Sequence, residues 1–206
     1  MIVTLIPAAG ASARMRGADK LLEPVDGIPA LRHAVQTALA ADLGPVLVTL
    51  REEDAARRRA VTGLDCQLLS VADASSGMSA SLRVGGAAAL ALLDADRSEG
   101  SGLLVHLPDM PDIQSADLVT LAQAFSAAEP HPLRAATQDG TPGHPTLFPT
   151  RLLHQFADLT GDQGARSVLA TEGVQLVPLP GRAAVMDLDT PEDWERWRAH
   201  RSSNTV

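Results

Sequence analysis

The chain has 206 residues, of which 45% are hydrophobic and 20% charged, so it is long enough to bury the core of one domain. Its net charge of −8 disfavours nucleic acid and anionic membranes as general partners, and its aromatic content of 2% argues against single-stranded nucleic-acid binding. The single cysteine, Cys66, excludes an intramolecular disulfide and a cysteine-based zinc site. No leader pattern and no apolar run of about 20 residues is visible, so we expect a cytoplasmic protein.

Short apolar runs alternate with helical segments along the first 130 residues. The expected strands are 2–6, 46–50, 66–70 and 102–107. The expected helices are 30–41, 53–61, 79–93 and 115–127, with Ser115 as the N-cap and Asp117 in the first turn of the last one. Such alternation with continuously apolar strands predicts a mostly parallel sheet covered on both faces. The second helix carries Arg57, Arg58 and Arg59 in a row, and we expect this run to form a solvated face.

After about residue 130 the pattern changes. A turn at Asp139-Gly140 separates segments that we expect to pair as antiparallel strands. The expected strands are 133–138, 145–148, 174–179 and 183–188, and the expected helices are 151–158, 162–172 and a last one from Pro191 to about His200. Thr190 is a favourable N-cap for that last helix. We therefore expect a single domain over residues 1–200 and a loose tail over 201–206.

The loop after the first strand is rich in small residues. In an open α/β sheet, ligands bind outside the carboxyl ends of the strands. Ala8, Ala9 and Gly10 let backbone N–H groups approach a ligand closely, and the cations of Arg14 and Lys20 follow within ten residues. The segment matches neither a Walker A loop nor a dinucleotide-binding loop. It predicts a cradle for a triphosphate, and the alternative is an ordinary surface loop.

Lys20 is the only lysine among 17 basic residues. Lysine is a compact point charge on a flexible stem and can reach between the oxygens of a polyphosphate, whereas the arginine fork needs more room. We therefore expect position 20 to lie in an enclosed phosphate site. The alternative is that one lysine has survived by chance.

Carboxylates follow two of the expected strands. Asp109 comes after strand 102–107, and Asp187 and Asp189 share a side if strand 183–188 continues. Oxygen ligands from neighbouring strand ends suit Mg²⁺, which also binds substrate phosphates. The alternative for Asp189 is a capping role at the last helix. Among the histidines, we expect His106 to be a satisfied core residue and His144, which lies in a loop, to contact a ligand.

Six segments, in order, resemble the motifs of the MobA-like nucleotidyltransferases. They are PAAGASARMRGADKLL (7–22), SGMSASLRVG (76–85), LPDMP (107–111), PGHPTLF (142–148), GDQGARSVL (161–169) and MDLDTPEDW (186–194). The resemblance runs from residue 2 to about 197 and is nearest to the molybdenum cofactor cytidylyltransferase branch. It implies a Rossmann-like three-layer α/β sandwich of the nucleotide-diphospho-sugar transferase type, whose mostly parallel sheet has a small antiparallel part.

The resemblance also implies an activity and a set of site residues. The activity is transfer of CMP from CTP onto the terminal phosphate of molybdopterin, with Mg²⁺ as cofactor and release of pyrophosphate. By similarity, the residues that contact the nucleotide are Ala8, Ala9, Gly10, Gly77, Ser79 and Ser81. Those that hold the triphosphate are Lys20 and Arg14, those that bind Mg²⁺ are Asp109 with Asp187 or Asp189, and those that face the acceptor are His144, Asp162 and Arg166. A molybdoenzyme or its chaperone is the implied protein partner.

Two departures from the family pattern leave the acceptor open. Arg16 stands where the family usually has glycine, and Pro108 stands where glycine or alanine is commoner. One alternative is a related transferase that uses GTP or another phosphorylated acceptor. The other is a non-catalytic nucleotide-binding maturation factor for molybdoenzymes. The presence of Lys20 and Asp109 disfavours the latter, because a pure binding module does not need metal ligands.

Overall fold

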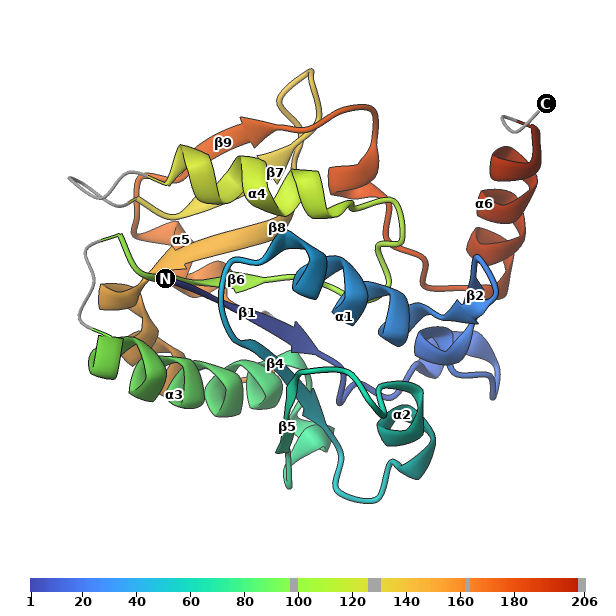
Figure 1. Ribbon diagram of the computed structural model, residues 1–206, viewed down its shortest axis with the longest axis horizontal. Helices are drawn as coiled ribbons and strands as arrows, with labels where there is room; N and C mark the ends of the chain where they lie inside the picture. Colours follow the sequence, from blue (N-terminus) through green and yellow to red (C-terminus); the bar gives the residue numbers. More distant parts are fainter. Residues whose placement is uncertain (97–99, 126–130, 162–163, 204–206) are drawn as a thin grey trace.

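The computed structural model describes residues 1–96, 100–125, 131–161 and 164–203 (Figure 1). Within them, seven strands form one sheet in the order β5-β4-β1-β6-β8-β7-β9. These strands are β1 (Ile2–Pro7), β4 (Val46–Leu50), β5 (Gln67–Ser70), β6 (Gly102–Val105), β7 (Leu133–Ala136), β8 (Pro142–Pro149) and β9 (Gln175–Pro178). Within this seven-stranded sheet, as far as the structure describes it, only β8 runs antiparallel to its neighbours, β6 and β7. The predicted mostly parallel sheet with a small antiparallel part is therefore confirmed.

Helices cover both faces of the sheet (Figure 1). The α-helices are α1 (Ala30–Ala41), α2 (Ala55–Ala60), α3 (Met78–Asp96), α4 (Ser115–Ala124), α5 (Arg166–Ala170) and α6 (Pro191–Ser203). The 3₁₀-helices are η1 (Ala13–Met15), η2 (Lys20–Leu22), η3 (Ala74–Ser76), η4 (Thr150–Asp158) and η5 (Ala183–Val185). A short hairpin joins β2 (Pro24–Val25) to β3 (Ile28–Pro29). No helix in the described ranges is both long and apolar enough to cross a membrane.

Alternate side chains of the central strands enter two separate cores. Ile6 of β1 and Leu104 of β6 pack with α1 and α4 on one face, and Leu5 and Leu103 pack with α3 and η4 on the other. All four residues are fully buried, with 0% of their surface exposed, because this sheet is covered by helices on both faces. A smaller cluster joins α6 to the first loop, where Met15 packs with Trp194 and Trp197.

A glycine in α3 brings this helix close to the first strand. A Cβ added to Gly85 would lie 2.4 Å from Leu5 Cδ2, which is closer than real Cβ atoms approach another atom. The missing side chain therefore lets α3 rest directly on β1. This contact fixes the start of α3 beside the loop that follows β1, where Ala9 packs against Ala80.

The predicted strand 183–188 is wrong. Ala183–Val185 form η5, and residues 186–188 pair with no strand in the described part of the chain. Ala184 and Leu188 are buried as the apolar pattern suggests, but the segment has no pairing strand beside it among the described residues. The segment instead crosses β8 at Gly143, where an added Cβ would lie 1.8 Å from the Ala184 carbonyl oxygen.

Two helix starts test the expected caps. Ser115 is the first residue of α4 rather than its N-cap, because the Gln114 N–H donates to the Asp117 carboxylate at 2.8 Å and the cap lies one residue earlier. The cap of α6 is confirmed, since the Asp193 N–H donates to Thr190 Oγ1 at 3.2 Å and the Asp193 carboxylate accepts from the Thr190 N–H at 2.9 Å. This last helix continues to Ser203 rather than ending near residue 200.

Candidate active site

The loop of residues 8–19 leaves the sheet at the carboxyl end of β1, next to the end of β4. Its first N–H, that of Ala8, donates to the Thr49 carbonyl at 2.9 Å and continues the ladder by one residue. Beyond it, the N–H groups of residues 9–14 donate to no backbone acceptor among the described residues. A series of free N–H groups in a turn favours an anion. The loop therefore has the donors that a polyphosphate requires.

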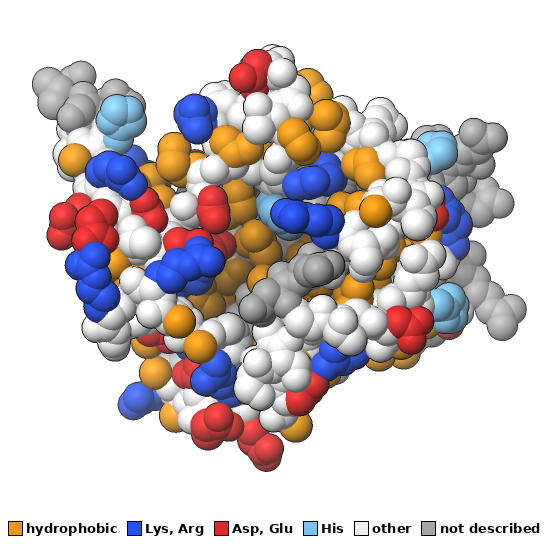
Figure 2. Space-filling model, turned by 180° about the vertical axis from the view of Figure 1, so that it is seen from behind, with side chains coloured by type: hydrophobic (Ala, Val, Ile, Leu, Met, Phe, Trp, Pro, Cys, Tyr) orange, Lys and Arg blue, Asp and Glu red, His pale blue; other side chains and the backbone are white. Residues whose placement is uncertain are grey.

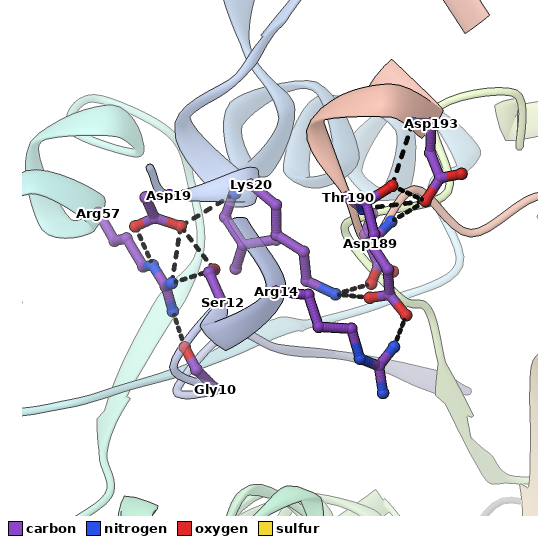
Figure 3. Close-up of polar contacts among 11 residues, drawn as sticks. Gly10, Ser12, Arg14, Asp19, Lys20, Arg57, Asp189, Thr190 and Asp193 are labelled. Carbon is purple, nitrogen blue, oxygen red and sulfur yellow. Dashed lines mark hydrogen bonds and ion pairs between the residues drawn. The ribbon is translucent and has the colours of Figure 1, made fainter. Parts of the chain in front are cut away.

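Arg57 of α2 binds this loop through its side chain. The prediction that the three arginines 57–59 form a solvated face is therefore wrong for Arg57. The Arg57 side chain is 4% exposed. Its guanidinium donates to the Ala8 carbonyl at 2.7 Å. It also donates to the Gly10 carbonyl at 2.7 Å and to Ser12 Oγ at 3.0 Å (Figure 3). Two further bonds, each of 2.7 Å, go to the Asp19 carboxylate. A run of three arginines gives no sign of this, because only the tertiary structure turns the first one toward the loop.

Lys20, at the start of η2, lies between two carboxylates. Its Nζ donates to Asp109 Oδ2 and, at 2.7 Å, to Asp189 Oδ1 (Figure 3). Burial by itself would lower the pKa of Lys20, but the charges and hydrogen bonds of the two aspartates outweigh it and raise the pKa. Arg14 pairs with the other oxygen of Asp189. Two cations and two carboxylates thus balance one another at the open edge of the sheet.

The two carboxylates can hold a divalent ion. Asp109 Oδ1 is buried and has no hydrogen-bond partner in the described residues, so one acceptor is left for a cation. Carboxylate oxygens are the ligands that Mg²⁺ prefers, and this ion commonly takes only one or two of them together with substrate phosphates. No group of three or more His, Cys, Asp or Glu side chains in the described ranges is arranged for a metal. The donor set therefore fits Mg²⁺ shared with a phosphorylated ligand.

The structure separates the two C-terminal aspartates. Asp189 lies in the cluster with Lys20 and Arg14, whereas Asp187 is exposed on the segment before it. Thr190, and not Asp189, caps α6, which leaves the Asp189 carboxylate for the two cations. Residue 16, where the family usually has glycine, has a φ of 53°, in the region that glycine favours, and its side chain forms a 2.7 Å ion pair with Glu192 of α6.

The motif of Gly77, Ser79 and Ser81 lies at the start of α3, beside the loop. Gly77 follows η3 with a φ of 81°, a backbone conformation that a residue with a side chain would adopt only with strain. Ser79 is buried, and its hydroxyl donates to the Ser76 carbonyl at 3.1 Å while its N–H donates to the Gly161 carbonyl at 3.3 Å. Ser79 therefore stabilises the start of the helix. Ser81, two residues later in the same helix, is also buried.

Gly10 offers a test of the loop that does not disturb the fold. A Cβ added there would meet no atom within 4 Å, and Gly10 does not have the positive φ that penalises side chains. We expect Gly10→Ala to leave the melting temperature unchanged and to raise the KM for a nucleoside triphosphate by about tenfold or more, because the methyl group would occupy the space in front of the free N–H groups. Gly173→Ala, whose added Cβ has its nearest neighbour at 3.7 Å, is the matched control. An unchanged nucleotide KM in Gly10→Ala would remove this residue from the site.

A second feature is a cavity of about 610 Å³ on the other side of β8 from η5. Its walls are mainly apolar, and its polar lining residues are Arg134, His144, Thr146 and Arg166. Figure 2 shows hydrophobic side chains at the bottom of a hollow, with basic side chains and a histidine beside it. His144 and Arg166, expected to face an acceptor, thus lie in one cavity, whereas Asp162 lies outside the described residues. Sequence reasoning missed Arg134, which donates to the Gly143 carbonyl at 3.1 Å.

Two histidines, the buried His106 and the partly buried His144, are held neutral. Burial lowers the pKa of His144 to about 4, and the Arg134 charge acts in the same direction. Burial lowers the pKa of His106 to about 3. The prediction that His106 lies in the core is confirmed, but neither of its ring nitrogens has a hydrogen-bond partner among the described residues, so it is not satisfied as expected. His144 Nδ1 lies 3.4 Å from Thr146 Oγ1.

We expect these histidines to make the free energy of unfolding fall as the pH drops below about 6.5, the pKa of an unperturbed histidine. Below that pH both histidines are protonated in the unfolded chain. In the folded chain they stay neutral until the pH approaches their lowered pKa values, about 4 for His144 and about 3 for His106. Each therefore contributes stability above pH 6.5 that is lost at about 1.4 kcal/mol per pH unit below it. Denaturant titrations of His106→Leu should show a shallower acid slope. His154 is exposed, so His154→Gln is the control. Equal slopes of unfolding free energy against pH in the wild type, His106→Leu and His154→Gln would contradict the expectation.

Comparison with known proteins identifies the family. The chain matches the MobA-like NTP transferase domain over residues 4–177. No curated protein matches it. It is similar to Rv0371c from Mycobacterium tuberculosis H37Rv, with 26% identity, a TM-score of 0.75 and coverage of 95% of this chain and 97% of that one. Rv0371c has also been solved in complex with manganese, and that structure is 25% identical with a TM-score of 0.73 over 95% and 96% of the two chains.

Two more distant structures share the fold. A nucleotidyl transferase from Methanothermobacter thermautotroptrophicus is 21% identical, with a TM-score of 0.77 over 100% of this chain and 99% of that one. A CMP:2-keto-3-deoxy-manno-octonic acid synthetase complexed with CTP is 14% identical, with a TM-score of 0.71 over 98% and 99% of the two chains. Because the family match covers most of the chain and the fold is that of nucleotidyltransferases, this chain belongs to the MobA-like NTP transferase domain family.

Proposed function

We propose that this nucleotidyltransferase moves CMP from CTP onto the terminal phosphate of a molybdopterin-type acceptor and releases pyrophosphate. The observation that carries the proposal is the convergence of Lys20, Arg14, Asp109 and Asp189 beside a loop of free N–H groups. The six motifs in order support the acceptor and the nucleotide, as does the Ala8-Ala9-Gly10 form of the loop, which is similar to the cytidylyl type. A neighbour of the same fold was solved with CTP, and Rv0371c with manganese.

The reaction forms a bond between an oxygen of the acceptor phosphate and the α-phosphorus of CTP. It breaks the bond from that phosphorus to the oxygen bridging to the β-phosphate, and pyrophosphate leaves with the electron pair. The acceptor phosphate needs no dedicated base, because its second pKa is about 6. The loop N–H groups, Lys20 and Arg14 bind the charge that gathers on the leaving pyrophosphate.

Asp109 and Asp189 are the residues that would hold Mg²⁺. When bound, this ion supplies a Lewis acid that stabilises and orients the phosphate oxygens. Before the nucleotide arrives, the same carboxylates neutralise Lys20 and Arg14. The raised pKa of Lys20 keeps its ammonium charged throughout the neutral range, so it is ready to transfer from carboxylate to phosphate partners.

The cavity beside β8 is the proposed acceptor site. Arg134 and Arg166 give it positive charge, which suits a phosphorylated acceptor, and the neutral His144 offers a hydrogen bond without adding a third cation. Because its walls are mainly apolar, a second candidate is the same transfer onto another phosphorylated acceptor, with CTP or GTP as donor. A molybdoenzyme or its chaperone is the proposed recipient of the product.

The test is release of pyrophosphate with each of the four nucleoside triphosphates, with and without Mg²⁺ and with and without molybdopterin. Release only with CTP, Mg²⁺ and molybdopterin together supports the proposal. Release with another nucleotide, or only with another phosphorylated acceptor, selects the second candidate. No release under any condition, with nucleotide binding intact by calorimetry, favours a non-catalytic maturation factor. Lys20→Ala serves as the inactive control.

A further inference from the structure

The loop of residues 8–19 is fixed by arginines of the following strand–helix unit. Three successive carbonyl oxygens accept from them: those of Ala8 and Gly10 from Arg57 Nη1, each at 2.7 Å, and that of Ala9 from Arg51 Nε at 2.8 Å. These carbonyls are therefore occupied before any ligand arrives. The N–H groups of residues 9–14, by contrast, find no backbone acceptor in the described part of the chain.

We propose that Arg57 is a positioning residue of the nucleotide site, which holds the loop in its donor-presenting conformation before the nucleotide binds. The proposal rests on the proposed function, because that function supplies the ligand of the loop. Unpaired N–H donors beside three carbonyls that are already occupied favour the phosphates of a nucleoside triphosphate. Arg57 does not touch this ligand itself, since its side chain is 4% exposed and lies behind the loop.

The contacts of Arg57 explain why this position requires an arginine. A guanidinium has five N–H donors in a fixed fork, and five bonds leave Arg57 for the loop: two to backbone carbonyls, one to Ser12 and two to Asp19. A lysine has three donors at a single point and cannot reach all of these acceptors. The backbone of Arg57 is fixed as well, because its N–H donates to the Asp54 carboxylate, the N-cap of α2, at 3.0 Å.

The same network reaches Lys20. Burial by itself would raise the pKa of Asp19, but the hydrogen bond and charge of Arg57 outweigh it and lower the pKa, so this carboxylate stays ionised. Asp19 in turn accepts from the Leu21 N–H at 3.0 Å at the start of η2. Arg57 therefore holds, through one carboxylate, the helix that carries the catalytic ammonium, as well as the loop itself.

We expect Arg57→Ala to raise the KM for the nucleotide by about 10–100-fold and to leave the KM for the acceptor unchanged, because a displacement of about 1 Å at a reacting site can cost 10²-fold. A merely structural role would instead reduce the amount of folded enzyme, which lowers kcat and moves neither KM. Arg57→Ala can also fail to fold, since it leaves buried carbonyls unpaired. Arg57→Lys keeps the charge and most of the volume, and we expect at least a tenfold rise in nucleotide KM from it.

The matched control is Arg59→Ala, two residues away on the same helix. Arg59 is exposed and donates to the Ala55 carbonyl of its own helix, and its loss should leave both KM values unchanged. Ethylguanidinium at millimolar concentration should lower the nucleotide KM of Arg57→Ala by filling the vacated space. Neutral urea at the same concentration should not, and neither compound should help Lys20→Ala.

The outcomes separate this inference from the proposed function. Folded Arg57→Lys with the nucleotide KM of the wild type, or with both KM values raised together, overturns the inference while the function stands. Wild-type protein that binds none of the nucleoside triphosphates by calorimetry overturns the proposed function, and the inference falls with it. A specific rise in nucleotide KM, reversed by ethylguanidinium in Arg57→Ala, supports both.

Discussion

Lys20→Arg is expected to lower kcat for pyrophosphate release by about 10²–10³-fold, although the charge is retained. The Lys20 ammonium fits between the Asp109 and Asp189 carboxylates, with 20% of its side chain exposed. A guanidinium is wider and spreads its charge over a plane, so it cannot hold this point between two carboxylates and the entering phosphates. Steady-state kinetics with saturating nucleotide and Mg²⁺ would measure the loss.

The loss in Lys20→Arg must be separated from unfolding. The melting temperature should stay close to that of the wild type, because the arginine can still pair with either aspartate. Arg59→Lys, an equally conservative exchange at an exposed position, should retain full activity. Full activity in Lys20→Arg would refute the point-charge explanation for the only lysine in the sequence.

Asp109→Asn is expected to reduce turnover by about 10³-fold at ordinary Mg²⁺, and a Mg²⁺ titration should not restore it. Asparagine keeps the shape of the side chain but loses the charge that a divalent ion requires. The buried Asp109 Oδ1, which has no partner among the described residues, is the atom that the ion would use. Pyrophosphate release measured across a Mg²⁺ series gives the result directly.

Neighbouring aspartates provide the comparison for Asp109→Asn. Asp65→Asn, at an exposed position before β5, is the neutral control. Asp189→Asn should follow Asp109→Asn, because Asp189 shares both Lys20 and Arg14. Normal Mg²⁺ dependence in Asp109→Asn would take this residue out of the metal site. An effect of Asp187→Asn larger than that of Asp189→Asn would reverse the choice between these two aspartates.

The meeting of Lys20 and Asp109 could be expected from the sequence alone. Both residues follow strands of one parallel sheet, and β1 and β6 are neighbours in it, with Leu5 paired to Val105. The carboxyl ends of neighbouring parallel strands lie at the same edge, so the loop after β1 that leads to Lys20 and the residues just beyond β6 are brought to one edge of the sheet. The apolar runs that identify these strands are continuous, which is the pattern of strands buried on both faces.

Arg57 could not be expected in the same way. Its neighbours in the sequence are also arginines, and local pattern cannot show which of three adjacent side chains turns inward. One signal was present: Asp54 precedes it by three residues, and a capping aspartate fixes the start of the helix and thus the direction of Arg57. That direction leads to the loop only because β4 lies beside β1, which is a tertiary fact.

The segment 183–189 shows a different limit. Its apolar residues suggest a strand, but β8 has β6 on one side and β7 on the other, so no place beside it remains for another strand. Arg134 was missed for a related reason. It lies within β7, and its part in the cavity depends on Arg166, which comes from α5, a helix that follows β8 and η4 in the sequence.

The contact of Gly143 with the Ala184 carbonyl has a consequence for how the two carboxylates come together. The strands of the sheet are complete at Pro178, yet Asp189 reaches Lys20 only after the later segment has docked across β8 at this glycine. A chain that stopped at Pro178 would contain every strand of this sheet and would still lack Asp189, one of the two carboxylates proposed to hold Mg²⁺. The carboxylate pair therefore depends on a segment that packs over the backbone at position 143, where glycine leaves the space for it.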